Sequence, residues 1–175
     1  MALVCKLTNH IPTFEYSWGI CGAIVCSWLS KMAAGKEVTC QEDLGAVSSL
    51  ILAQHKAMKG DEEESRRKVF NHFGFNEINK ATYNAAGSAP LYNHNNFAIA
   101  ASKEGCHYLS ICYFNHNDDP QQHAIGAFMK DEKFYLCDAN FGIWKFDSQA
   151  DFVDGIKGLT DDMYEVLSGS VYHLA

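Results

Sequence analysis

Two glycines flank a cysteine in the most chemically suggestive stretch of this chain, SWGICGAIVCSWL at 17–29. Apolar residues recur here at spacings of three and four, which predicts an amphipathic helix over 19–32 with Cys21 in its first turn. The unpaired N–H groups and the dipole at a helix start favour a thiolate, whereas an unperturbed cysteine, with a pKa of about 8.5, is mostly protonated at neutral pH. Cys21 is therefore a candidate nucleophile, and the alternative is a small buried residue of the core.

A nucleophilic cysteine needs a general base, and eight histidines compete for that role. A strand pair that turns at 131–132 narrows the choice, because its register places His123, Asp138 and Asn140 on one face of the sheet. Asp138 then lies diagonally across from His123, at a backbone distance of roughly 7–8 Å that a carboxylate can span to hydrogen-bond the imidazole. The strand pair thus offers His123 as the base and Asp138 or Asn140 as the group that orients it.

The elements that must position these groups change in character near residue 90. Before that point the patterns are helical, and we expect helices over 19–32, 44–60 and 61–73. After it we expect short helices at 97–103 and 148–157 and aromatic-rich strands at 107–114, 123–130, 133–139, 141–146 and 164–172. Helices first and antiparallel strands second is an α+β order, in which N-terminal helices pack on a C-terminal antiparallel sheet.

Length and composition bound the domain organisation and the partners. A chain of 175 residues with 47% hydrophobic residues is long enough for one folded domain, and we expect residues 1–175 to form it. The net charge of −7, with no run rich in lysine and arginine, argues against nucleic acid and is compatible with a protein or peptide partner that carries a basic segment. No stretch approaches the roughly 20 apolar residues of a transmembrane helix, and the start of the chain shows no Sec signal pattern.

The cysteine and histidine spacings predict neither a metal site nor another cofactor. The seven cysteines are odd in number, which is typical of reduced core thiols rather than of a disulfide framework. No CxxC, HExxH or HxE…PCxxC pattern is present, and Cys21 with Cys26 forms a CxxxxC that has no second pair.

Three segments resemble the YopT-like cysteine proteases, which are type III secretion effectors of the papain-like superfamily. GICGAIVCSWL is similar to that family's Gly-x-Cys block with a tryptophan seven residues after the cysteine, and HAIGAF contains His123. YLCDANFGIWKF is similar to its Asp-x-Asn-Phe-Gly segment and the aromatic-rich strand that follows. Papain-like enzymes often carry Gln or Asn shortly before the cysteine as an oxyanion donor, whereas here Glu15 stands six positions upstream and Asn9 is the nearest upstream amide.

The resemblance implies a papain-like fold and a cysteine protease with a Cys-His-Asp triad. Cys21 would be the nucleophile, His123 the general base and then acid, and Asp138 the group that orients the imidazole. It also implies a virulence setting, in which a secreted bacterial effector or toxin cleaves a protein inside a host or target cell; without delivery, we expect a cytoplasmic protein. The same thiol chemistry leaves deamidation, transglutamination and cell-wall peptide amidase activity open, as well as a catalytically silent binding module.

Overall fold

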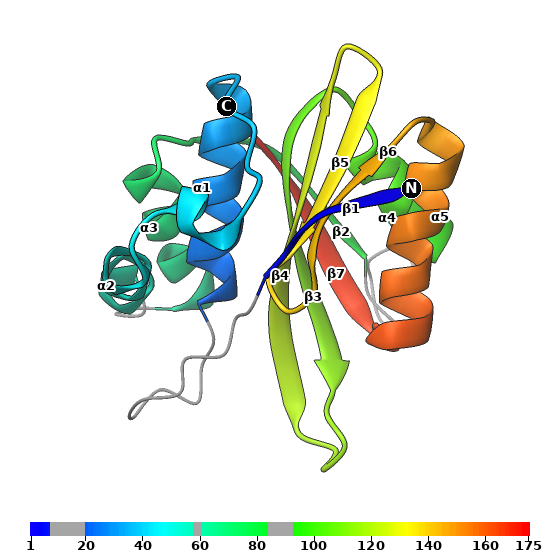
Figure 1. The fold of residues 1–175 in the computed structure, drawn as a ribbon. Coiled ribbons are helices and arrows are strands. Elements are labelled where there is room, and N and C mark those ends of the chain that lie inside the picture. The colour runs from blue at the N-terminus through cyan, green and yellow to red at the C-terminus, as the bar shows by residue number, and fades with distance from the viewer. Residues whose placement is uncertain (8–19, 58–60, 84–92) are drawn as a thin grey trace.

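The computed structural model describes residues 1–7, 20–57, 61–83 and 93–175 (Figure 1). Asn9, Glu15 and Gly19, which the sequence analysis singled out, lie outside the described residues. The elements follow the order β1 (Ala2–Lys6), α1 (Cys21–Ala33), η1 (Gln41–Leu44), α2 (Val47–Ala57), α3 (Glu62–His72), β2 (Glu77–Tyr83), α4 (His94–Ala101), β3 (Gly105–Phe114), β4 (Pro120–Lys130), β5 (Lys133–Asp138), β6 (Gly142–Phe146), α5 (Gln149–Lys157), η2 (Gly158–Met163) and β7 (Ser168–Leu174).

In the described part of the chain the strands form one seven-stranded sheet, ordered β1-β6-β5-β4-β3-β7-β2, and every pair in it is antiparallel. The strands predicted after residue 90 are confirmed, with shifts of a few residues at their ends. The prediction of a purely helical N-terminal half is wrong, because β1 and β2 form the two edges of the sheet. β2 is mostly exposed and its sequence, EINKATY, lacks the apolar run that reveals a central strand, whereas β1, ALVCK, is apolar but only five residues long.

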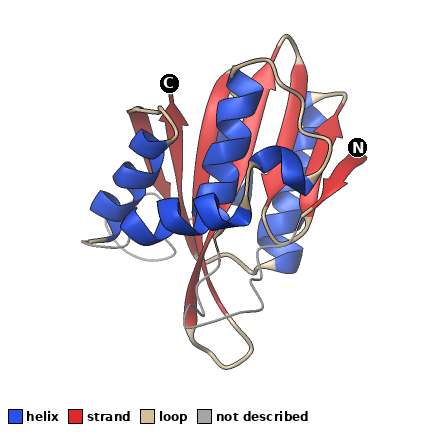
Figure 2. Cartoon of the chain, turned by 60° about the vertical axis from the view of Figure 1, so that its left-hand side comes forward, coloured by secondary structure: helices blue, strands red, loops and turns tan. Residues whose placement is uncertain are grey.

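Helices cover both faces of the sheet. Helices α1, α2 and α3 lie on one face and α4 and α5 on the other (Figure 1), and Figure 2 brings the face with the N-terminal helices forward. Each layer has its own buried cluster, with Trp28 and Leu29 of α1 in one and Phe146 and Phe152 in the other. The prediction that N-terminal helices pack on the sheet is confirmed for the face covered by α1, α2 and α3.

Two local features place α1 and the β4–β5 hairpin where the candidate site needs them. A Cβ added at Gly126 of β4 would come within 2.9 Å of the Trp28 ring, so the missing side chain lets α1 lie close against β4. The hairpin turns at 131–132, where both residues have positive φ, and pairs Ile125 with Asp138. The register predicted from the sequence is therefore confirmed.

Candidate active site

Cys21 is the first residue of α1 and is partly buried. Burial raises the pKa of its thiol, but three hydrogen bonds outweigh that effect and hold the pKa below its ordinary value. They come from the side chain of His123 and from the backbone N–H groups of Ala124 and Gly22, and the charge of His123 acts in the same direction. The thiolate is therefore stabilised by groups from both α1 and β4.

His123 links this thiol to a buried carboxylate. Its Nε2 lies 3.0 Å from Oδ1 of Asp138, and the two side chains are only 3% and 0% exposed. Because Nε2 faces Asp138, Nδ1 is the ring nitrogen left for Cys21. Burial lowers the pKa of His123, but the hydrogen bonds and charges of Asp138 and Cys21 raise it to about 10. These interactions favour the protonated imidazole.

The ends of the strands explain why the helix start can reach this histidine. Pairing between β4 and β5 ends at Ile125 and Asp138, whereas β4 continues back to Pro120 beside β3 alone. The first turn of α1 fits over this open edge, where the N–H of Ala124 contacts Cys21. The structure thus brings together the three residues singled out in the sequence.

Asp138 accepts further hydrogen bonds that the sequence did not reveal. The backbone N–H of Asn140 donates to Oδ1 at 2.8 Å, and the Tyr164 hydroxyl donates to Oδ2 at 2.9 Å. The side chain of Asn140 donates to the Tyr164 hydroxyl at 3.0 Å, so Asp138, and not this amide, contacts the imidazole. Tyr164 was expected at the start of the last strand, but it follows η2, and nothing local in the sequence links it to Asp138.

The start of α1 also meets an amide from another helix. Gln54 of α2 accepts a hydrogen bond from the N–H of Ala23 at 3.0 Å. A Cβ at Gly22 would lie 2.9 Å from Oε1 of Gln54 and 3.1 Å from the Tyr108 hydroxyl, so the glycine lets both polar groups lie close to the helix start. Gln54, which the sequence analysis did not select, places a side-chain amide beside the helix start.

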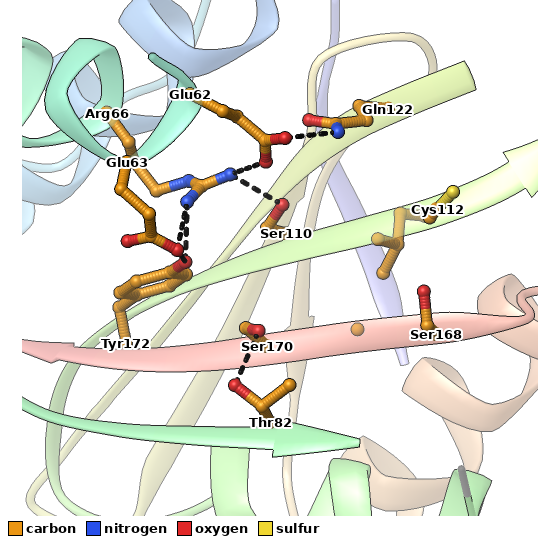
Figure 3. A pocket seen from close by; sticks show the side chains of 12 residues that line it. Glu62, Glu63, Arg66, Thr82, Ser110, Cys112, Gln122, Ser168, Ser170 and Tyr172 are labelled. Carbon is orange, nitrogen blue, oxygen red and sulfur yellow. Dashed lines mark hydrogen bonds and ion pairs between the residues drawn. The ribbon is translucent and has the colours of Figure 1, made fainter. Parts of the chain in front are cut away.

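The described residues also form a polar pocket of about 200 Å³ (Figure 3). It lies between the start of α3 and strands β3 and β7, and Gln122, next to His123 in β4, closes one side by donating to Glu62 at 2.6 Å. The buried guanidinium of Arg66 forms its back wall. The partners of this cation are Glu62, Glu63, Ser110 and Tyr172. Two carboxylates therefore neutralise the buried charge, and the pocket offers mainly hydrogen-bonding groups.

Other features of the described residues bear on the expected classes of function. Within these ranges, no three or more His, Cys, Asp or Glu side chains are grouped so as to hold a metal ion. The same part of the chain contains no helix with the length and apolar character needed to span a membrane. All seven cysteines are free thiols.

Comparison with known proteins relates the chain to others through its fold. No family model and no curated protein matches it. The crystal structure of the Pseudomonas avirulence protein AvrPphB is similar, with a TM-score of 0.64 and 21% identity over 89% of this chain and 91% of that chain. A double glycine motif protease from an AMS/PCAT transporter, solved in complex with the leader peptide, has a TM-score of 0.41 and 12% identity over 97% of this chain and 96% of that one. The chain therefore has the papain-like α+β fold of AvrPphB, as the sequence predicted.

Proposed function

We propose that this chain is a papain-like cysteine protease, with residues 1–175 as one catalytic domain. The observation that carries the proposal is that His123 interacts with both other residues: its Nε2 lies 3.0 Å from Oδ1 of Asp138, and its interaction with Cys21 lowers the pKa of the thiol and raises that of the imidazole. Nucleophile, base and orienting group in this order are the elements of thiol-based acyl transfer. AvrPphB, whose fold the chain shares, is a YopT-like cysteine protease effector, which supports the assignment.

The mechanism follows from these positions. The Cys21 thiolate attacks the scissile carbonyl and forms a tetrahedral intermediate, whose oxyanion is stabilised by the backbone N–H of Cys21 at the start of α1. The imidazolium of His123 donates its proton to the leaving amine, which departs and leaves a thioester on Cys21. Neutral His123 then takes a proton from water, which attacks the thioester, and collapse of the second intermediate releases the acid and restores the thiolate. Asp138 stabilises the imidazolium in both halves of the cycle.

The substrate proposed is a protein or peptide. The polar pocket lined by Gln122, Glu62 and Arg66 offers hydrogen-bonding groups to a substrate side chain. The net charge of −7 favours a target with a basic segment. By its fold and its sequence resemblance to secreted effectors, we further propose that the chain is a bacterial virulence effector or toxin that acts inside a target cell, where a reducing cytosol keeps Cys21 a free thiol.

A peptide library tests the proposed reaction. The purified chain and its Cys21→Ala variant are incubated with peptides derived from a host-cell proteome, and the products are identified by mass spectrometry. New peptide termini that only the parent chain produces would support a protease. A gain of about one mass unit at glutamine would identify a deamidase instead, and an amine adduct a transglutaminase. Cleavage restricted to cell-wall peptides, tested in parallel, would identify an amidase.

A thiol assay distinguishes an enzyme from a binding module. The parent chain is treated with iodoacetamide across the pH range, and alkylation is mapped to individual cysteines. We expect Cys21 to react at a lower pH than an ordinary thiol and its reaction midpoint to rise in His123→Ala, because the imidazolium stabilises the thiolate. An ordinary midpoint that His123→Ala leaves unchanged would refute the proposed nucleophile and favour a catalytically silent module.

A further inference from the structure

Tyr164 connects the candidate site to the last part of the chain. It lies just after η2, is 6% exposed, and donates through its hydroxyl to both oxygens of Asp138, at 2.9 Å and 3.2 Å. Its ring centroid is 5.1 Å from that of His123, with an angle of 36° between the ring planes. One side chain therefore contacts both the carboxylate and the imidazole of the proposed site.

The two carboxylate oxygens of Asp138 have different hydrogen-bond partners. Oδ1 faces Nε2 of His123 and the N–H of Asn140, whereas the donor to Oδ2 at 2.9 Å is the Tyr164 hydroxyl. A carboxylate bound at both oxygens is restrained from rotating, so Oδ1 stays directed at the imidazole. The side chain of Asn140 donates to the Tyr164 hydroxyl, which fixes the orientation of the hydroxyl in turn.

The hydroxyl also acts on charge. Burial raises the pKa of Tyr164 well above its ordinary value, and the negative charge of Asp138 raises it further, so the group remains a hydrogen-bond donor over the working pH range. A donor to a carboxylate stabilises its negative charge and weakens it as an acceptor for other groups. Tyr164 therefore moderates the attraction that Asp138 exerts on the imidazolium of His123.

We propose that Tyr164 is a positioning residue of this site, which directs Asp138 toward His123 and moderates how tightly the imidazolium holds its proton. The inference rests on the proposed function, because an imidazolium that is held too strongly is a poor proton donor to a leaving amine. The effect of the Tyr164 hydroxyl can be separated from packing, because the hydroxyl contacts Asp138 whereas the ring contacts His123.

The test compares Tyr164→Phe with Tyr113→Phe. The first variant keeps the ring over His123 and loses the hydroxyl, while the second loses the hydroxyl of the tyrosine whose ring lies 4.9 Å from that of Tyr164. The ring nitrogens of the histidines are followed by ¹⁵N NMR across the pH range, and the signal of His123 is assigned with His123→Ala. Loss of one hydrogen bond to a charged group corresponds to a shift of about one pH unit or more. We therefore expect the pKa of His123 to rise by about one unit in Tyr164→Phe and to stay unchanged in Tyr113→Phe.

Turnover provides the second measurement, on a peptide that the parent chain cleaves and normalised to the Cys21 thiol titrated by iodoacetamide. We expect Tyr164→Phe to lower kcat about tenfold with little change in KM. An unchanged imidazole titration and an unchanged kcat per titrated thiol, with only a lower melting temperature, would overturn the inference and make Tyr164 a packing residue. If the parent chain cleaves no peptide while the imidazole shift is still found, the proposed function fails and the contact from Tyr164 to the imidazole through Asp138 is retained.

Discussion

Replacing Asp138 with asparagine removes one charge from the centre of the site and leaves its shape nearly unchanged. The carboxylate is fully buried and lies 3.0 Å from Nε2 of His123. An asparagine can still accept a hydrogen bond from this nitrogen, but it no longer supplies a negative charge. The change therefore isolates the electrostatic part of the interaction between Asp138 and His123.

The size of the effect follows from the pKa of the imidazole. Burial lowers it, and Asp138 and Cys21 together raise it from 6.5 to about 10. At 1.36 kcal/mol per unit, this rise corresponds to a preference for the imidazolium on the order of 5 kcal/mol. The hydrogen bond from His123 to Asp138 makes the largest contribution that raises this pKa. We therefore expect Asp138→Asn to lower the pKa of His123 by at least about two units.

The charge of His123 affects both the stability of the fold and the pKa of Cys21. A raised pKa means that His123 stabilises the folded parent chain fully below about pH 6.5, and that this contribution is lost as the pH rises through about 10. In Asp138→Asn the loss begins at a lower pH, because the imidazole gives up its proton earlier. The pKa of Cys21 then rises, since less imidazolium is present to stabilise the thiolate.

Alkylation of Cys21 by iodoacetamide, measured from pH 4 to 10 by peptide mass spectrometry, checks this prediction. We expect the midpoint to move upward in Asp138→Asn, together with a fall in kcat for any peptide that the parent cleaves. Asn140→Ala is the matched control, because it removes a neighbouring amide and leaves the backbone N–H that donates to Asp138. Identical alkylation profiles in the parent chain and Asp138→Asn, or a larger shift in Asn140→Ala, would refute the electrostatic role given to Asp138.

Three further outcomes follow from the same geometry. Cys21→Ala should abolish activity and move the melting temperature by no more than about 4 °C, whereas a larger fall would support a core role for this thiol. Gly126→Ala should destabilise the fold by about 1–3 kcal/mol in denaturant titration, because the new Cβ meets the Trp28 ring at 2.9 Å; an unchanged midpoint would contradict the close approach of α1 to β4. Activity should survive excess EDTA, and a loss that added zinc restores would assign a metal to the reaction.

Much of the candidate site could be predicted from local patterns. The helix that starts at Cys21 is set by apolar spacing. The face shared by His123 and Asp138 is set by the hairpin turn at 131–132, which lies between them in the sequence. Such features depend on neighbours in the sequence, because helix period, strand alternation and turn length fix side-chain direction locally. The structure confirms the register of this hairpin and the position of the cysteine at the helix start.

The remaining features depend on contacts between distant segments. The edge strand β2 has little apolar pattern of its own and exists through its pairing with β7, roughly ninety residues later. Gln54 reaches the site from α2 and Tyr164 from the residues after η2, and no residue near them in the sequence indicates Cys21 or Asp138. The sequence by itself determined which groups could do chemistry and how two of them align. Only the tertiary structure decided that α1 begins beside the open edge of β4 and which buried donors hold the carboxylate, because these contacts arise when helices and sheet pack together.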